Sequence, residues 1–409
     1  MNLFLLLQMT MTRLGRNKVK TLLMSLGIVV SVFTTAVIQT AGGGFRDAFT
    51  IFIDRVYPAD SIWLISGSGP MGAGSLGDAR NNLRIGDVNT VLSSISEIKL
   101  WDPIVQLGAR NLKRDGKNVS VPVVGVSDKS DEVRRRGVVD GEFFSEEDVR
   151  NRNNIALIGA TTAKALFADE SAIGQQLFID NVPFTVKGIL ESQGVDPHGG
   201  DQDDVIYLPY TTIMDKMTHI DYFSGVIFSV KDRADVESVA TQIIKIIRDR
   251  HQILQGQPDD FGVVTPLFVQ TLVNKSFKIF AIFIPLIAGT AFLVSGLIIL
   301  SIMLITIKER TPEIGLRKAL GARPADLQIQ ILLEVAIIAA VAALVGLILA
   351  QVAEDAMAPM LAHKFGVMHL STSVATLTIA ALAAIATGVI GALLPARRAA
   401  RLNPVEALK

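Results

Sequence analysis

Hydrophobic residues are concentrated in four long runs, whereas the stretch between the first two has the mixed polarity of a water-soluble protein. Residues 21–41, 279–307 and 371–396 contain no charged side chain, and residues 327–353 contain one, Glu334. The first run has 21 residues, which as a helix span about 32 Å, the thickness of a bilayer's hydrocarbon core. Four such runs predict four transmembrane helices rather than buried helices of a large soluble protein.

The second and third runs each have a special feature. The second has 29 uncharged residues, about 43 Å as a helix, so it either tilts or projects beyond the hydrocarbon. We favour an outward stalk with Pro285 as a candidate kink, and place helix plus stalk at 277–307. Glu334 lies about 10 Å into its helix, where a lipid-facing carboxylate costs about 3 kcal/mol. We therefore expect its side chain to face protein, either as a structural polar contact between helices or as part of a coupling mechanism.

Lysine and arginine next to the runs set the orientation. Residues 1–20, 308–326 and 397–409 are rich in these cations and are predicted to be cytoplasmic. The loop 354–370 carries Glu354 and Asp355 against Lys364 and is predicted to be external, as is the long insertion 42–276. The sequence thus predicts a multi-pass protein of the plasma (inner) membrane with both termini in the cytoplasm.

Both ends of the first run carry further signals. The run exceeds the roughly 7–15 apolar residues of a cleaved signal peptide, so we interpret it as a retained helix. Before it, Leu3, Phe4 and Leu7 recur at helical spacing with Arg13 and Arg16 following, which predicts a leader helix along the inner membrane surface. After it, the run Gly42–Gly44 predicts a flexible exit.

The external insertion mixes short alternating segments with helical ones. Asp115-Gly116 and Asp180-Asn181 each separate two strand candidates and predict hairpin turns. Strand candidates also flank this middle part, so we expect two lobes, with one inserted in the other. The predicted strands are 61–65, 105–112, 119–126, 155–158, 176–179, 184–189 and 226–230, and the predicted helices are 85–98, 161–167 and 235–250. The fold class is therefore four transmembrane α-helices plus a large two-lobed α+β extracytoplasmic domain inserted between helices 1 and 2.

Composition and motifs remove several functions. Lys+Arg and Asp+Glu are balanced at 39 each, so nucleic acid is not indicated as a partner, and the absence of cysteine excludes disulfides and thiolate sites. No phosphate-binding P-loop, nucleophile elbow or H-E-x-x-H motif occurs. His198 with Asp201, Asp203 and Asp204 is the nearest approach to a metal cluster, and we interpret it as a solvated loop. We therefore expect no catalytic residues, metal or cofactor in this chain.

The stretch 308–322 has the marks of a short framed helix. Thr311 is a candidate cap, Pro312 suits the first position, Glu313 complements the positive helix end and Gly321 is a candidate stop. Glu313 and Arg317 stand four residues apart, and Leu316, Ala319 and Leu320 form an apolar patch. A stiff amphipathic helix between two membrane helices suits force transmission or docking, although a well-capped surface turn has the same features.

The chain also resembles a known family, the MacB type of ABC transporter permease within the FtsX-like group. Residues 309–322 and 395–408 resemble its cytoplasmic loop and tail. The remaining matches are residues 16–28 at the first membrane helix and residues 141–148, 157–159 and 203–209 in its periplasmic core domain. Pro312 and Ser301 depart from the residues usual there, and the ATPase domain fused to MacB does not occur in this sequence.

This resemblance implies a mechanism and partners. A separate ABC ATPase subunit is expected to bind ATP and Mg²⁺, and its closure is expected to move the loop helix and, through it, the external domain (mechanotransmission). The permease is expected to form a homodimer or a paralogue heterodimer in membrane lipid and to drive efflux or release with a periplasmic adaptor protein. The residues expected to couple to the ATPase are Glu309, Arg310, Thr311, Glu313, Arg317 and Lys318, and Glu334 is the polar residue within the membrane.

Two other functions stay open at this point. An FtsX-like dimer can instead control an extracytoplasmic enzyme, although the large two-lobed insertion favours export. A membrane-anchored enzyme has no catalytic constellation to support it. The sequence leaves the cargo undetermined.

Overall fold

The computed structural model describes residues 18–67, 82–168, 170–196, 199–365 and 373–402. The chain divides into two units: a helix bundle, formed by Met1–Asp47, Ser276–His363 and Val367–Lys409, and an α+β domain, formed mainly by Ala48–Lys275. The predicted leader helix, and His198 of the candidate metal cluster, lie outside the described residues.

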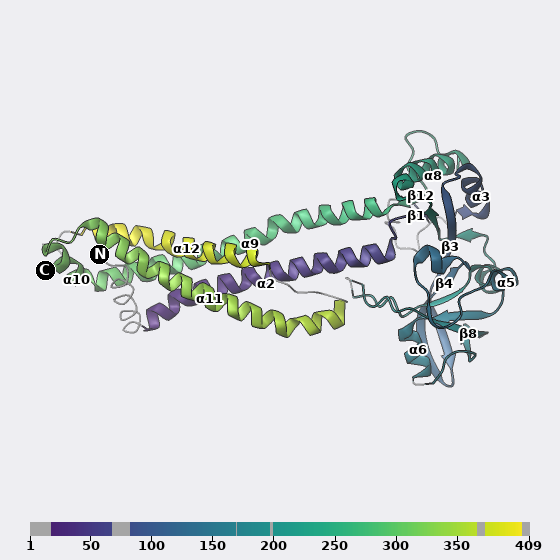
Figure 1. Ribbon diagram of the computed structural model, residues 1–409, viewed down its shortest axis with the longest axis horizontal. Coiled ribbons are helices and arrows are strands. Elements are labelled where there is room, and N and C mark those ends of the chain that lie inside the picture. The colour runs from purple at the N-terminus through teal and green to yellow at the C-terminus, as the bar shows by residue number, and fades with distance from the viewer. Residues whose placement is uncertain (1–17, 68–81, 169, 197–198, 366–372, 403–409) are drawn as a thin grey trace. The chain divides into compact units, whose positions relative to one another are not determined.

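Four helices of the bundle are long and apolar enough to cross a membrane, as predicted. They are α2 (Lys18–Val56), α9 (Pro266–Glu309), α11 (Pro324–Phe365) and α12 (Val374–Ala400), and the short α10 (Thr311–Ala319) joins α9 to α11 (Figure 1). Their shared core consists of buried aliphatic residues from all four long helices, among them Ile28, Ile299, Ala339 and Ala384.

Glycine and alanine let the four helices approach closely. A Cβ on Gly346 would lie 2.9 Å from the carbonyl oxygen of Val29 in α2. A Cβ on Gly391 would lie 2.8 Å from that of Gly296 in α9, and Gly388 packs against Ala339 of α11. These positions therefore serve packing within the chain, where small residues replace the hydrophobic effect as the source of close contact between membrane helices.

Two sequence expectations about these helices are wrong. Gly42–Gly44 is not a flexible exit, because α2 continues through it to Val56; beside apolar surface, intrahelical hydrogen bonds outweigh the low helix propensity of glycine. Pro285 lies inside α9, and the kink expected there stays a prediction. Glu354 belongs to α11 rather than to a loop, and its buried carboxylate accepts a 2.8 Å hydrogen bond from Thr40 Oγ1 of α2.

The α+β domain is built on one mixed sheet of ten strands in the order β12-β1-β11-β3-β4-β9-β6-β8-β5, with β7 paired to β3 and β8. The strands are β1 Ser61–Ser66, β2 Leu83–Arg84, β3 Ile98–Arg114, β4 Lys117–Val126, β5 Val138–Gly141, β6 Ile155–Ile158, β7 Gln176–Ile179, β8 Val182–Leu190, β9 Ile206–Pro209, β10 Tyr222–Phe223, β11 Gly225–Val230 and β12 Phe261–Val264. The helices are α3 Ile85–Ser94, α4 Ser130–Arg134, α5 Glu146–Arg150, α6 Ala160–Phe167, α7 Tyr210–Thr212, the π-helical η1 Ile213–Thr218, the 3-10 turn η2 Arg233–Asp235 and α8 Val236–Arg250.

The long strand β3 explains the two predicted lobes. Its first part pairs with β11, and its second part pairs with β4 and β7. β4 and β9 are neighbours in the sheet although β5 to β8 lie between them in the sequence, so the segment from β5 to β8 is an insertion. The β3-β4 hairpin turns at Asp115 and Gly116, whose φ angles are 46° and 81°, and the β7-β8 hairpin turns at Asp180 and Asn181, at 48° and 70°. Positive φ at both central residues gives the turn that matches strand twist, so both predicted hairpins are confirmed.

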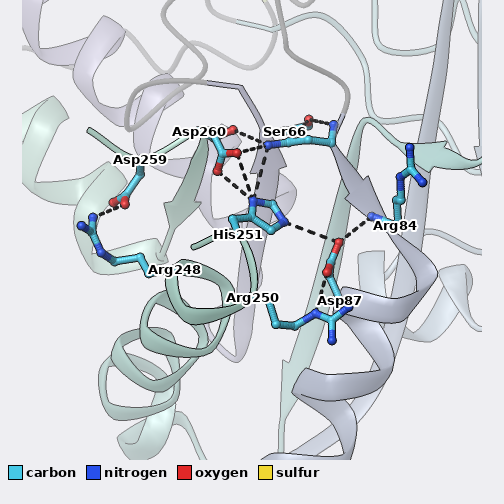
Figure 2. A network of polar contacts seen from close by, with 9 residues as sticks. Ser66, Arg84, Asp87, Arg248, Arg250, His251, Asp259 and Asp260 are labelled. Atoms are coloured by element: carbon cyan, nitrogen blue, oxygen red, sulfur yellow. Dashed lines mark hydrogen bonds and ion pairs between the residues drawn. The ribbon is translucent and has the colours of Figure 1, made fainter. Parts of the chain in front are cut away.

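A polar network joins three segments of the α+β domain (Figure 2). His251, after α8, places Nδ1 2.9 Å from Asp260 Oδ1 and Nε2 3.6 Å from Asp87 Oδ2 of α3. Burial alone would raise the pKa of Asp87, but hydrogen bonds from Arg250 and from the backbone N–H of Arg84 outweigh it and hold that pKa below its ordinary value. The network therefore joins the end of α8 to the start of α3 and to the residue before β12.

Candidate coupling site

The predicted cytoplasmic helix exists as α10, with nine residues. Its start differs from the expectation, because the cap position falls on Arg310, and Thr311 is already helical and donates from Oγ1 to the carbonyl of Ile307 at 3.0 Å. The hydroxyl thus extends the last turn of α9 instead of capping α10. Gly321, at φ +92°, closes the helix as predicted, because that left-handed conformation favours glycine.

The inner face of α10 packs on three membrane helices. Ile314 is buried together with Ile307 of α9, Leu327 of α11 and Ala399 of α12. One small apolar cluster therefore joins α10 to the ends of three membrane helices.

Arg310 and Glu334 form the central ion pair of this site. Arg310 Nη1 lies 3.4 Å from each carboxylate oxygen of Glu334, and the two side chains are 23% and 13% exposed. Glu334 therefore faces protein, as its position in an apolar run required. The pair joins the α9-α10 corner to α11.

Two further cations of α10 bind groups of the same chain. Arg317 donates to Glu313 at 2.6 Å, the predicted i, i+4 pair, and to the side-chain oxygen of Gln330 in α11 at 3.3 Å. Lys318 Nζ donates to the carbonyls of Ala400 and Leu402, at 2.9 and 2.7 Å. A cation at the carbonyl end of a helix is stabilised by the helix dipole. Lys318 therefore fixes α10 to the end of α12.

Sequence reasoning missed several partners at this site. Glu309 pairs with Lys20 at the start of α2, so the fourth membrane helix is also attached. In the sequence, Lys20 is only one of the cations that set the orientation, and Gln330 lies one helical turn before Glu334 on α11. Their polarity within or beside an apolar run was the available signal.

The outer face of α10 is apolar and open. Leu316 is 54% and Leu320 81% exposed, and Pro312 and Ala319 are exposed beside them. A space at the inner face, lined by Arg310, Glu313 and Glu334 among others, has a volume of about 30 Å³. That is room for about one water molecule. The open apolar surface of the site is therefore on the outer face of α10.

Within the described part of the chain no group of three or more His, Cys, Asp or Glu residues is placed to hold a metal ion. Asp203 of the candidate cluster is buried and accepts from Arg136 Nη2 at 2.9 Å and from the backbone N–H of Gln193 at 2.7 Å. Asp201 and Asp204 accept hydroxyl hydrogen bonds from Thr161 and Thr162. These contacts are structural.

Comparison with known proteins decides the family. Residues 21–246 match the family model of the MacB-like periplasmic core domain, and residues 285–404 match that of the FtsX-like permease C-terminal region. The chain belongs to the MacB-type, FtsX-like permease family. The resemblance noted in the sequence and the predicted fold class are thereby confirmed.

The relatives carry the MacB name. The macrolide export ATP-binding/permease protein MacB of Bdellovibrio bacteriovorus is 30% identical over 400 residues, covering 97% of this chain and 60% of the relative. The protein of the same name from Hyphomonas neptunium is 30% identical over 410 residues, with 98% and 60% covered. The chain thus spans about 60% of the length of these curated relatives.

Solved structures are also similar to part of this chain. The crystal structure of the periplasmic region of MacB from Actinobacillus actinomycetemcomitans has 20% identity and a TM-score of 0.46, and covers 54% of this chain and 95% of that one.

Proposed function

We propose that this chain is the permease of an ABC transporter in the plasma (inner) membrane, and that ATP is hydrolysed on a partner ATPase subunit. The observation that carries the proposal is the construction of α10. Its inner face is fixed to α9, α11 and α12 by Ile314, Arg310 and Lys318, while its outer face presents Leu316 and Leu320 to solvent.

The two faces of α10 have different roles in this proposal. The charged residues predicted for ATPase coupling are held by the chain's own groups, so we propose that they position the helix and transmit its motion. The exposed leucines, with Pro312 and Ala319, supply the contact itself. Full burial of a leucine side chain contributes about 1.5–3 kcal/mol. Burial of the two exposed leucines is therefore enough to hold a short helix in a groove.

The transport cycle follows from this division. Closure of the ATPase displaces α10, the apolar cluster and ion pairs carry the displacement into α9 and α11, and those helices move the α+β domain on the outer side. Both termini and α10 lie in the cytoplasm in this scheme, because the basic segments flank them. Substrate is then driven out or released without crossing the bilayer through this chain.

Partners follow from the family. Two copies of the permease, or one copy with a paralogue, pair with two ATPase subunits, and the α+β domain binds a periplasmic adaptor protein. Since the relatives are named for macrolide export, macrolides are the first cargo to test.

The test replaces the exposed leucines and leaves the inner face unchanged. Leu316→Asp with Leu320→Asp is expected to lower affinity for the cognate ATPase by at least tenfold, equal to about 1.4 kcal/mol, in a co-purification titration. Val139→Asp, at a valine 71% exposed in the α+β domain, is the matched control. Wild-type ATPase affinity in the double variant would exclude α10 as the docking helix.

A further inference from the structure

One face of the sheet in the α+β domain carries a cavity of about 340 Å³. Its floor is a single row across three strands: Gln106 of β3 pairs with Val124 of β4, which pairs with Tyr207 of β9. Trp63 of β1 and Pro122 of β4 complete the apolar part of the lining. The size and the aromatic lining are those of small-molecule sites, which occupy about 300–1,000 Å³.

Two buried ion pairs stand against the ring of Tyr207. The guanidinium carbons of Arg134 and Arg136 lie 5.7 and 5.6 Å from the ring centroid. Arg134 Nε is 2.7 Å from Asp102 Oδ2, and Arg136 Nη2 is 2.9 Å from Asp203 Oδ1. The positive charges of the two arginines are therefore cancelled by carboxylates behind them, and the cavity gains no net positive charge from them.

Two more carboxylates line the cavity and are not cancelled. Asp201 and Asp204 accept hydrogen bonds from the hydroxyls of Thr161 and Thr162, at 2.7 and 3.0 Å. Across the ranges that the structure describes, no lysine or arginine lies within ion-pair distance of either. Hydroxyl donors leave the charge in place, so the cavity attracts a cation, and aromatic faces nearby add to that attraction.

Two residues of the lining also hold donors without an acceptor. Trp63 Nε1 and Arg134 Nη2 are buried and make no hydrogen bond to any part of the chain that the structure describes. A buried donor without a partner costs about 1–3 kcal/mol. A ligand with carbonyl, hydroxyl or sulfonyl oxygens would remove that cost with a small shift of either side chain.

We propose that this cavity binds an amphipathic amine. The apolar body lies on the row formed by Gln106, Val124 and Tyr207, the ammonium group faces Asp201 and Asp204, and acceptor oxygens of the ligand take the hydrogen atoms of Trp63 and Arg134. The proposal concerns binding alone, and it stands whether or not the chain acts with an ATPase.

The experiment uses the tryptophan of the cavity as its reporter. The chain has two tryptophans, so the Trp101→Phe variant leaves Trp63 alone. Full-length protein in lipid nanodiscs is titrated with dansylcadaverine, a cationic aromatic sulfonamide, and energy transfer from Trp63 is measured after subtraction of protein-free nanodiscs. Dansylamide, which is neutral, and dansylglycine, which is anionic, are matched probes. We expect affinity to fall in the order cation, neutral, anion.

Variants then locate the probe. Asp201→Asn with Asp204→Asn is expected to weaken dansylcadaverine about tenfold and to leave dansylamide unchanged, because about two exposed charge interactions are lost. Asp221→Asn, at an exposed carboxylate outside the cavity, is the control. Gln106→Phe places a ring at an exposed position in the cavity and is expected to abolish transfer from every probe.

Three results would overturn the proposal: equal affinity for the cationic and anionic probes, full dansylcadaverine affinity in the double asparagine variant, or undiminished transfer in Gln106→Phe. Thermal unfolding of each variant shows whether it is folded. If the double variant unfolds, the probe series and Gln106→Phe still decide between the two outcomes.

Discussion

The ion pair between Arg310 and Glu334 gives the sharpest prediction about the coupling site. At 3.4 Å two unit charges attract by about 5 kcal/mol when the effective dielectric constant is about 20. Both side chains give up most of their hydration, which offsets a large part of that attraction. We therefore expect a net coupling energy of about 2 kcal/mol, larger than that of a surface pair.

A double-mutant cycle measures this coupling. Arg310→Gln, Glu334→Gln and the double variant are compared by unfolding of the full chain in mixed detergent micelles. Each single variant is expected to lose about 2–3 kcal/mol, because it leaves one partly buried charge without its partner, and the double variant is expected to lose about 2 kcal/mol less than the sum. A charge swap, Arg310→Glu with Glu334→Arg, restores part of the loss.

The same helix offers the matched control. Arg317 and Glu313 pair at 2.6 Å, but their side chains are 33% and 49% exposed, so their cycle is expected to give about 0.5 kcal/mol or less. A coupling energy for Arg310 and Glu334 no larger than this control would refute the claim that the pair fastens α10 to α11.

Two further predictions concern the α+β domain and the bundle. Burial raises the pKa of Asp148, but the ammonium of Lys187 at 2.6 Å and hydrogen bonds from a neighbouring serine and asparagine outweigh it and hold that pKa well below its usual range. A carboxyl group whose pKa is lower in the folded state stabilises the fold at pH values above its unfolded pKa of about 3.9, and this stabilisation is lost as the pH falls below that value. The difference in unfolding midpoint between wild type and Asp148→Asn should therefore shrink between about pH 5 and pH 2. A constant difference would contradict the assignment. Gly391→Val would place a Cβ 2.8 Å from the carbonyl oxygen of Gly296 and should destabilise the bundle by about 1–3 kcal/mol in mixed micelles. Gly289→Val, where a Cβ would have nothing within 4 Å, should be near neutral. Equal effects of the two substitutions would disprove the close contact.

Local patterns were sufficient for much of the fold. Apolar runs of bilayer length with at most one charge revealed the four long helices, since length and apolarity alone decide whether a helix spans. The two hairpins followed from Asp-Gly and Asp-Asn pairs that tolerate positive φ. The frame of α10 followed from Pro312 and Gly321, which stand at either end of nine helical residues.

Contacts between distant segments were beyond such patterns. Lys318 binds carbonyls 82 and 84 residues away, and a lysine beside an arginine in a basic loop gives no sign of that. The cavity combines residues from β1, β3, β4 and β9, which only the strand order brings together. Gly42–Gly44 misled because helix propensity is a weak prior that packing and an apolar environment override.

One measurement tests the central claim, that α10 docks an ATPase in the cytoplasm while the α+β domain lies outside. The chain has no cysteine, so Val139→Cys and Leu320→Cys each create a single exposed thiol for a membrane-impermeant maleimide. In intact spheroplasts we predict labelling at residue 139 and none at residue 320; after lysis residue 320 should react, and co-expression of the cognate ATPase should protect it. Labelling of both residues before lysis, or no protection by the ATPase, would contradict the account.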